Sequence, residues 1–135
     1  MSARKALVVD DDDDVREITS FALEVMGGWT VVDTDRGTKA LGLARDQQPD
    51  LVLLDVMMPD LDGPGTFRKL QEDPRTRHIP VILLTAKVQV GEGRPWDDLA
   101  VLGVIAKPFD PVGLVQQIDR LLGEHVAAVS TRLSA

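Results

Sequence analysis

Five short apolar runs, separated by longer amphipathic stretches, constrain the fold of this chain more than any other feature. They lie at residues 6–9, 29–32, 51–54, 81–84 and 104–106. Three of the runs are almost continuously β-branched or leucine, which is typical of strands covered on both faces. The second run leads into Asp33 and Thr34, and we expect it at a more peripheral place in the sheet. Strands that alternate with helices predict βα units and an α/β fold with a doubly wound parallel sheet.

The stretches between the runs carry helix signals. Apolar residues recur at helical spacing over residues 15–25, and the two glycines at 27–28 supply a stop. A second helix around residues 40–44 ends before Pro49. Apolar residues within 67–70 indicate a short third helix. With the helices expected further along the chain, about five helices flank about five strands.

The C-terminal third of the chain is less regular. Residues 91–95 contain two glycines and a proline that break any long helix, so we expect a loop there and then a short helix over about 96–102. A last helix starts around Pro111, a residue suited to the first helical position. Residues 126–135 are small and polar, and we expect a frayed tail. The domain is therefore predicted to span residues 1–125.

The composition excludes several classes of function. The chain has 135 residues, of which 44% are hydrophobic, and this is enough for one globular domain with a buried core. Its formal net charge of -7 argues against a nucleic-acid-binding surface, which needs an excess of Lys and Arg. It has no cysteine, so thiolate catalysis and disulfides are excluded. No stretch approaches the roughly 20 apolar residues of a membrane helix, and we expect a cytoplasmic protein.

Polar residues follow the apolar runs where the strands of a parallel sheet would end. Residues 10–14 are all aspartates and follow the first run, while Asp55 follows the third, Thr85 the fourth and Lys107 the fifth. In an open α/β sheet, ligands bind beyond the carboxyl ends of the strands. The acidic groups, the hydroxyl and the lysine are therefore expected to converge on one edge of the sheet.

The expected cluster indicates phosphoryl chemistry. Neighbouring carboxylates repel one another unless a cation lies among them, and an all-oxygen site with room for water suits Mg2+. A carboxylate beside such a cation can act as a nucleophile toward phosphorus. Lys107 and Thr85 would supply positive charge and a hydrogen bond to the phosphoryl oxygens. The sequence thus predicts that Asp55 accepts a phosphoryl group.

Four motifs carry a family resemblance. They are LVVDDD at 7–12, LDVMMPDLDG at 54–63, LTA at 84–86 and AKPF at 106–109. Each motif alone is weak, but in this order, at strand ends and with this spacing, they resemble the receiver domain of two-component response regulators. The resemblance covers about residues 5–123. It implies a stand-alone, single-domain member with a flavodoxin-like, five-stranded parallel sheet of strand order 2-1-3-4-5 and helices on both faces.

The resemblance also implies a metal site. Asp10 and Asp11 match the acidic pair that holds the metal, and of the two we expect Asp11 to contact the metal directly. Asp55 matches the phosphoacceptor, which is also a metal ligand. Met57 matches the residue whose backbone carbonyl completes the metal shell. The implied cofactor is Mg2+.

Two further matches concern the phosphoryl group and the function. Thr85 matches the switch hydroxyl, and Lys107 matches the motif lysine, with a cis bond expected between Lys107 and Pro108. The resemblance implies a phosphorelay signalling switch that catalyses only its own phosphorylation and dephosphorylation and is otherwise not an enzyme. The implied partners are a histidine kinase or a histidine phosphotransfer protein and a downstream protein target. We expect a monomer that binds neither nucleic acid nor membrane.

One position departs from the family pattern. Three residues before the motif lysine, the family often has Tyr or Phe, whereas this chain has Val104. The aromatic part of the usual switch is therefore missing. We expect residues 91–95 to respond to phosphorylation in its place, because their glycines reorganise at little cost. That response would expose or hide a surface that includes Trp96.

Two other functions are compatible with parts of the sequence. Residues 11–15 satisfy the Asp-x-Asp-x-Thr/Val signature of haloacid-dehalogenase-type phosphatases, in which Asp11 would be the nucleophile of a true enzyme. Such a match arises easily in a run of five aspartates, the chain is short for that fold, and Asp55 would have no role. The other alternative is a receiver-like scaffold that is never phosphorylated, and the intact set of site residues speaks against it.

Several residues near the motifs have simpler structural interpretations. The aspartates at 12–14 are interpreted as the cap of a following helix, whose dipole favours negative charge at its start. Asp60 and the pair at 62–63 are most simply turn residues. The methionines at 57–58 are expected to pack.

Overall fold

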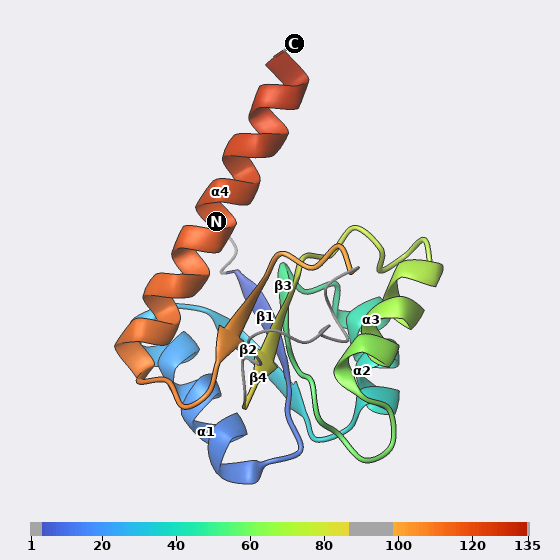
Figure 1. The fold of residues 1–135 in the computed structure, drawn as a ribbon, viewed down its shortest axis with the longest axis vertical. Coiled ribbons are helices and arrows are strands. Elements are labelled where there is room, and N and C mark those ends of the chain that lie inside the picture. Colours follow the sequence, from blue (N-terminus) through green and yellow to red (C-terminus); the bar gives the residue numbers. More distant parts are fainter. Residues whose placement is uncertain (1–3, 87–98, 135) are drawn as a thin grey trace, which may run out of the picture.

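The computed structural model describes residues 4–86 and 99–134. Five strands form one sheet in the order β2-β1-β3-β4-β5, and all neighbouring strands are parallel (Figure 1). The predicted fold class and strand order are confirmed, as is the peripheral place of the second strand. The strands are β1 (Lys5–Val9), β2 (Thr30–Thr34), β3 (Leu51–Asp55), β4 (Val81–Thr85) and β5 (Gly103–Ala106).

Helices cover both faces of the sheet (Figure 1). They are α1 (Asp13–Phe21), a π-helical turn (Ala22–Met26), α2 (Gly37–Gln47), α3 (Gly63–Glu72) and α4 (Pro111–Ser134). α2 and α3 pack against one face, while α1, the π-helical turn and α4 pack against the other. The two helical layers leave the carboxyl ends of the strands free to carry a site.

Alternation along the strands divides the buried side chains into two cores. Leu7 of β1 and Leu54 of β3 pack with the α2–α3 layer. Val8 and Leu53, their neighbours in sequence, pack with the α1–α4 layer. This is the period of two that a strand imposes on its side chains. β3 and β4 are buried along their whole length, so both are enclosed between the two cores up to their last residues.

The first helix ends earlier and packs differently from what its apolar spacing suggests. At Ala22 it gives way to the π-helical turn, in which the Gly27 N–H donates to the Ala22 carbonyl (3.2 Å). Three of the apolar residues that predict the helix lie on its solvent side. Ile18, Phe21 and Val25 are 46%, 52% and 66% exposed. The apolar spacing therefore marks an exposed stripe in addition to a helix.

Two predictions for the C-terminal third need correction. Residues 99–102 are not helical. The Leu102 N–H instead donates to the Val81 carbonyl (2.7 Å), where the pairing of β5 with β4 begins. The rest of that predicted helix and the segment 91–95 lie outside the described residues. Residues 126–134 are helical rather than a frayed tail, because the chain has no glycine or proline after Gly123 and a helix propagates readily once formed.

α4 extends well beyond the sheet. Arg4, which directly precedes β1, forms an ion pair with Asp119 of α4 (4.0 Å), so the helix has reached the amino edge of the sheet at this residue. Its remaining turns stand clear of the sheet in Figure 1. The last helix thus begins near the carboxyl ends of the strands and finishes beyond their amino ends.

Candidate functional site

Asp10 directly follows β1 and is fully buried. Its N–H donates to the Thr34 carbonyl (3.2 Å), which extends the pairing of β1 with β2. Its carbonyl accepts a hydrogen bond from Nη1 of Arg16 (2.9 Å), and its Oδ1 accepts one from the Asp12 N–H (3.0 Å). Backbone and side chain are therefore both fixed at the point where the strand ends.

The rest of the acidic run belongs to the start of α1. Asp12 is the N-cap, and its Oδ1 accepts hydrogen bonds from the N–H groups of Asp14 (3.0 Å) and Val15 (3.2 Å). Asp13 forms an ion pair with Arg16 at 2.7 Å. The interpretation of this run as a helix cap is confirmed. Arg16 was not identified from the sequence, although its spacing of three residues from Asp13 is the usual signal of a helical ion pair.

β3 delivers Asp55 to the same edge of the sheet. The residue is only 5% exposed, and its Oδ1 accepts a hydrogen bond from the Met57 N–H (3.4 Å). The following Val56 N–H donates to the Leu84 carbonyl (2.9 Å). A Cβ on Gly63 would lie 2.5 Å from the Asp55 carbonyl oxygen, so α3 begins directly against the strand end and needs glycine there.

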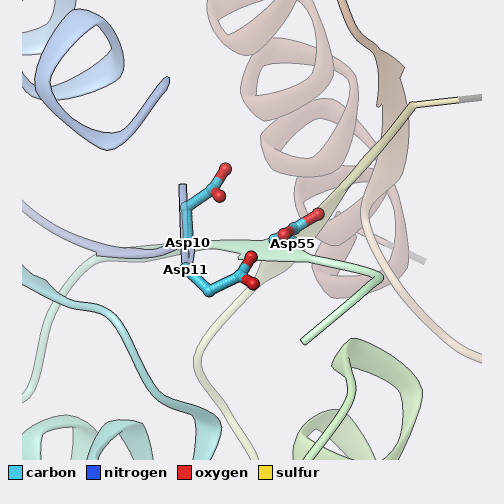
Figure 2. A group of neighbouring side chains, drawn as sticks. All are labelled: Asp10, Asp11 and Asp55. Atoms are coloured by element: carbon cyan, nitrogen blue, oxygen red, sulfur yellow. The ribbon is translucent and has the colours of Figure 1, made fainter. Parts of the chain in front are cut away.

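The structure brings three carboxylates together. One oxygen each from Asp10, Asp11 and Asp55 lies within 4.8 Å of the other two (Figure 2). They come from the ends of β1 and β3, which are neighbours in the sheet. Asp10 and Asp55 are buried and Asp11 is exposed, so the cluster is open to solvent on the side of Asp11.

Lys107 links two of these carboxylates. Its Nζ donates to Asp10 Oδ2 (2.8 Å) and to Asp55 Oδ1 (3.2 Å). Its N–H donates to the Thr85 carbonyl (2.7 Å), and its peptide bond to Pro108 is cis, as predicted. Burial alone would lower the pKa of Lys107, but the hydrogen bond and charge of Asp10 and the charge of Asp55 raise it above its ordinary value. Lys107 is therefore a permanent positive charge in the cluster.

The pKa of Asp55 is raised to about 7. Loss of hydration on burial is the main cause, the negative charge of Asp10 adds to it, and the charge of Lys107 opposes it. The cluster contains three carboxylates and one ammonium group, so it has an excess of negative charge when Asp55 is ionised. A divalent cation would offset that excess, and an all-oxygen ligand set is the one Mg2+ prefers. The residues present therefore fit Mg2+.

The other predicted site residues lie at the same edge. Thr85 is the buried last residue of β4 and pairs in register with Ala106, which directly precedes Lys107. Met57 is 73% exposed, so the expectation that both methionines pack is wrong for this residue. Its backbone N–H donates to Asp55 Oδ1 at the end of β3, whereas its side chain points away from the core. The expectation is correct for Met58, which is buried.

Val104 lies in β5 beside Leu83 of β4. It is half-buried and packs against the α2–α3 core. An aliphatic side chain at this position has no ring to swing between a buried and an exposed place, in agreement with the sequence-based interpretation.

The comparisons with known proteins agree with the geometry. The family model for the response regulator receiver domain matches residues 6–119. The chain belongs to this family. It is 36% identical over 118 residues to the DNA-binding dual master transcriptional regulator RpaA of Synechocystis sp., covering 87% of this chain and 48% of RpaA. It is 34% identical over 122 residues to the phosphate regulon transcriptional regulatory protein PhoB of Pseudomonas aeruginosa, covering 90% of this chain and 53% of PhoB. This chain thus spans about half the length of these curated relatives.

Solved structures also resemble this receiver domain. The chemotaxis protein CheY4 of Vibrio cholerae matches with a TM-score of 0.81 at 25% identity, covering 89% of this chain and 99% of that one. The receiver domain of sensor histidine kinase PA1611 from Pseudomonas aeruginosa matches with a TM-score of 0.80 at 26% identity, covering 90% of this chain and 99% of that one. The PA1611 structure is described with a magnesium ion coordinated in its active site cleft.

Family membership establishes the class of function. Receiver domains are phosphoacceptor switches of two-component signalling rather than conventional enzymes, in agreement with the predicted class of function. None of these similarities favours the phosphatase or the unphosphorylated scaffold. Receiver domains bind Mg2+ at an acidic pocket and interact with histidine kinases and downstream targets. In the part of the chain that the structure describes, every helix is too short or too polar to cross a membrane.

Proposed function

We propose that this receiver domain accepts a phosphoryl group on Asp55 from a phosphohistidine of a histidine kinase or a histidine phosphotransfer protein. The observation that carries the proposal is the position of Lys107 Nζ between Asp10 and Asp55, at 2.8 Å and 3.2 Å. This lysine lies where a phosphoryl group on Asp55 would need a positive charge. The exposure of Asp11 leaves the cluster open to an incoming donor.

The reaction is a displacement at phosphorus by Asp55. One carboxylate oxygen of ionised Asp55 forms the new O–P bond, while the bond from phosphorus to the histidine nitrogen of the donor breaks and its electron pair stays on the imidazole. Lys107 neutralises a phosphoryl oxygen, and the Thr85 hydroxyl donates a hydrogen bond to another. The same residues would assist hydrolysis of the acyl phosphate, so the domain catalyses only its own phosphorylation and dephosphorylation.

Mg2+ would be held by Asp10, Asp11, Asp55 and the backbone carbonyl of Met57. When bound, it would offset the negative charge of the carboxylates and of the phosphoryl oxygens. Lys107 already occupies one oxygen each of Asp10 and Asp55. Asp11 is the exposed member of the cluster, and we assign to it the largest contribution to metal binding.

Removing the charge of Asp11 should weaken Mg2+ binding much more than removing the charge of Asp13. We expect Asp11→Asn to weaken the affinity by about tenfold or more, because ligands and their close supports typically have effects of this size. Asp13→Asn makes the same change of net charge, but Asp13 is paired with Arg16 outside the cluster. Chemical shifts followed during a Mg2+ titration measure both affinities. Equal losses in the two variants would contradict the assignment.

An exposed apolar stripe beside the site supports a protein as the phosphodonor. Ile18, Phe21 and Val25 form this stripe on α1 and the π-helical turn. A pocket of about 110 Å3 connects it to the site and is lined by Val15, Ile18, Lys107, Pro108 and Phe109. Apolar side chains exposed next to a reactive group are typical of a protein docking surface. A partner that covers the stripe would carry its phosphohistidine toward Asp55.

Phosphorylation by a small donor tests the proposed function. Incubation with acetyl phosphate and Mg2+ should add a single phosphoryl group to each chain, and peptide mapping should locate it on Asp55. The modification is expected not to exceed one group per chain, because Asp55 is the only acceptor that we propose. Continued release of phosphate from many phosphomonoesters would instead support a phosphatase with Asp11 as its nucleophile. Failure to modify the chain at all would support the scaffold.

A further inference from the structure

The N-terminus of α2 is capped by a residue from a different part of the chain. Arg36 occupies the N-cap position and provides no side-chain acceptor for the first N–H groups of the helix. Most N-caps supply an oxygen there. In this protein, Oδ2 of Asp60 accepts hydrogen bonds from Oγ1 of Thr38 (2.8 Å) and from the Thr38 N–H (3.4 Å). Asp60 lies 22 residues further along the chain, in the β3–α3 loop (residues 56–62).

The β3–α3 loop is the segment that carries Met57. Its first residue is anchored to β4 by the bond from the Val56 N–H to the Leu84 carbonyl (2.9 Å). Its last residue, Asp62, caps α3 by accepting a hydrogen bond from the Gly65 N–H (2.7 Å). The pair of Thr38 and Asp60 therefore attaches the middle of the loop to α2, between these two anchored ends.

The contact between α2 and the loop is close. A Cβ on Gly37 would lie 2.5 Å from the carbonyl oxygen of Leu61, so the first residue of α2 packs directly on the loop backbone. Asp60 and Pro59 also line a cavity of about 490 Å3 together with Asp11. Asp60 therefore contacts α2 and shares a cavity with Asp11 of the acidic cluster. The hydrogen bond from Thr38 lowers the pKa of Asp60, so Asp60 is a charged acceptor at neutral pH.

We propose that Thr38 and Asp60 form a positioning pair that holds the β3–α3 loop beside the acidic cluster and thereby raises the affinity of the site for Mg2+. The proposal rests on the proposed function, in which the backbone carbonyl of Met57 is a metal ligand. A loop held in place before the metal arrives loses less conformational freedom on binding. Neither residue is among the proposed metal ligands, so both would act through the loop.

Two substitutions of Thr38 test the pair without any change of charge. Thr38→Val keeps the size and branching of the side chain and removes its hydroxyl donor, whereas Thr38→Ser keeps the hydroxyl. We expect Thr38→Val to weaken Mg2+ binding about fivefold, the equivalent of one hydrogen bond of about 1 kcal/mol. Thr38→Ser should bind Mg2+ as the wild type does. Thr38 is exposed, so both variants should fold.

A second readout needs no metal. In metal-free protein, amide hydrogen exchange over residues 57–61 should be faster in Thr38→Val than in the wild type, with the exchange of β3 and β4 unchanged. A purely global loss of stability would accelerate exchange in the strands as well, and this result would overturn the proposal. Thr38→Ser serves as the matched control in the same experiment.

A double-mutant cycle shows whether the effect passes through Asp60. In an Asp60→Ala background, Thr38→Val should cause no further loss of Mg2+ affinity. The proposal is overturned if the wild type binds Mg2+ and Thr38→Val binds it equally well. It is also overturned if Thr38→Ser is as impaired as Thr38→Val, or if Thr38→Val has its full effect without Asp60. Absence of Mg2+ binding in the wild type would instead refute the proposed function, while the exchange measurement would still test the attachment of the loop.

Discussion

Asp55→Asn should abolish phosphorylation of this protein by acetyl phosphate and Mg2+. The substitution keeps the shape of a side chain that is only 5% exposed, but the amide has no carboxylate oxygen to attack phosphorus. The fold should be preserved, because the substitution changes only the last residue of β3 and leaves the four buried apolar residues before it in place. Intact-mass spectrometry after incubation with the donor measures the loss.

Asp12→Asn is the matched control for this experiment. It removes a carboxylate close to the cluster in sequence, but an asparagine at an N-cap still accepts the hydrogen bonds that Asp12 accepts at the start of α1. This variant should be phosphorylated like the wild type. Normal phosphorylation of Asp55→Asn would refute the assignment of the phosphoacceptor.

The metal-free protein should lose stability as the pH rises from about 4 to about 8. The carboxyl of Asp55 has a pKa of about 7 in the folded protein and an ordinary value of 3.8. Between these values the folded state binds more protons at Asp55 than the unfolded state, so the free energy of unfolding falls as the pH rises. The difference between the two pKa values corresponds to about 4 kcal/mol. Screening by solvent on the open side of the cluster reduces the expected full loss to on the order of 3 kcal/mol, which is reached above the folded pKa. The raised pKa of Lys107 acts only at much higher pH, where its contribution is lost.

Urea unfolding at several pH values measures this effect, with Asp55→Asn as the comparison. The variant cannot ionise at this position, so its stability should exceed that of the wild type near pH 8, and the difference should disappear near pH 4. Mg2+ should stabilise the wild type more at pH 8 than at pH 6, because the metal competes with the proton on Asp55. A difference in the free energy of unfolding between the wild type and the variant that does not change with pH would contradict the raised pKa of Asp55.

The convergence of the site residues was predictable because it depends only on strand ends. An apolar run followed by a polar residue marks the end of a strand, and parallel strands end at the same edge of the sheet. Asp10, Asp55, Thr85 and Lys107 each stand at such an end. Neither side-chain conformation nor strand order is needed for this inference, which is why the sequence was sufficient.

The pairing within the site was not predictable from the same argument. That Lys107 bridges Asp10 and Asp55 depends on burial and side-chain conformation, which strand ends do not specify. Arg16 acts on the backbone carbonyl of Asp10, and Asp60 caps a helix that begins far earlier in the chain. Such contacts depend on tertiary packing and leave no regular spacing in the sequence.

Helical periodicity was informative about structure but not about the buried face. The spacing of Ile18, Phe21 and Val25 predicts a helix, yet the sheet covers the opposite side of α1. Apolar residues at helical spacing are compatible with a core face and with a docking face, and only the position of the helix on the sheet distinguishes them.

The length of α4 would let this helix act as a lever arm whose first turn lies close to Lys107 in the sequence. The helix begins at Pro111, shortly after Lys107, and runs for 24 residues to Ser134. At 1.5 Å per residue it is about 35 Å long, so a tilt of ~10° at its first turn would move its far end by ~6 Å. Because that end lies beyond the amino edge of the sheet, a small change around Lys107 would be amplified into a displacement that another protein can detect. Such a tilt would also shift Leu114 and Ile118, which are buried against the sheet, so the core beneath α4 would take part in the change.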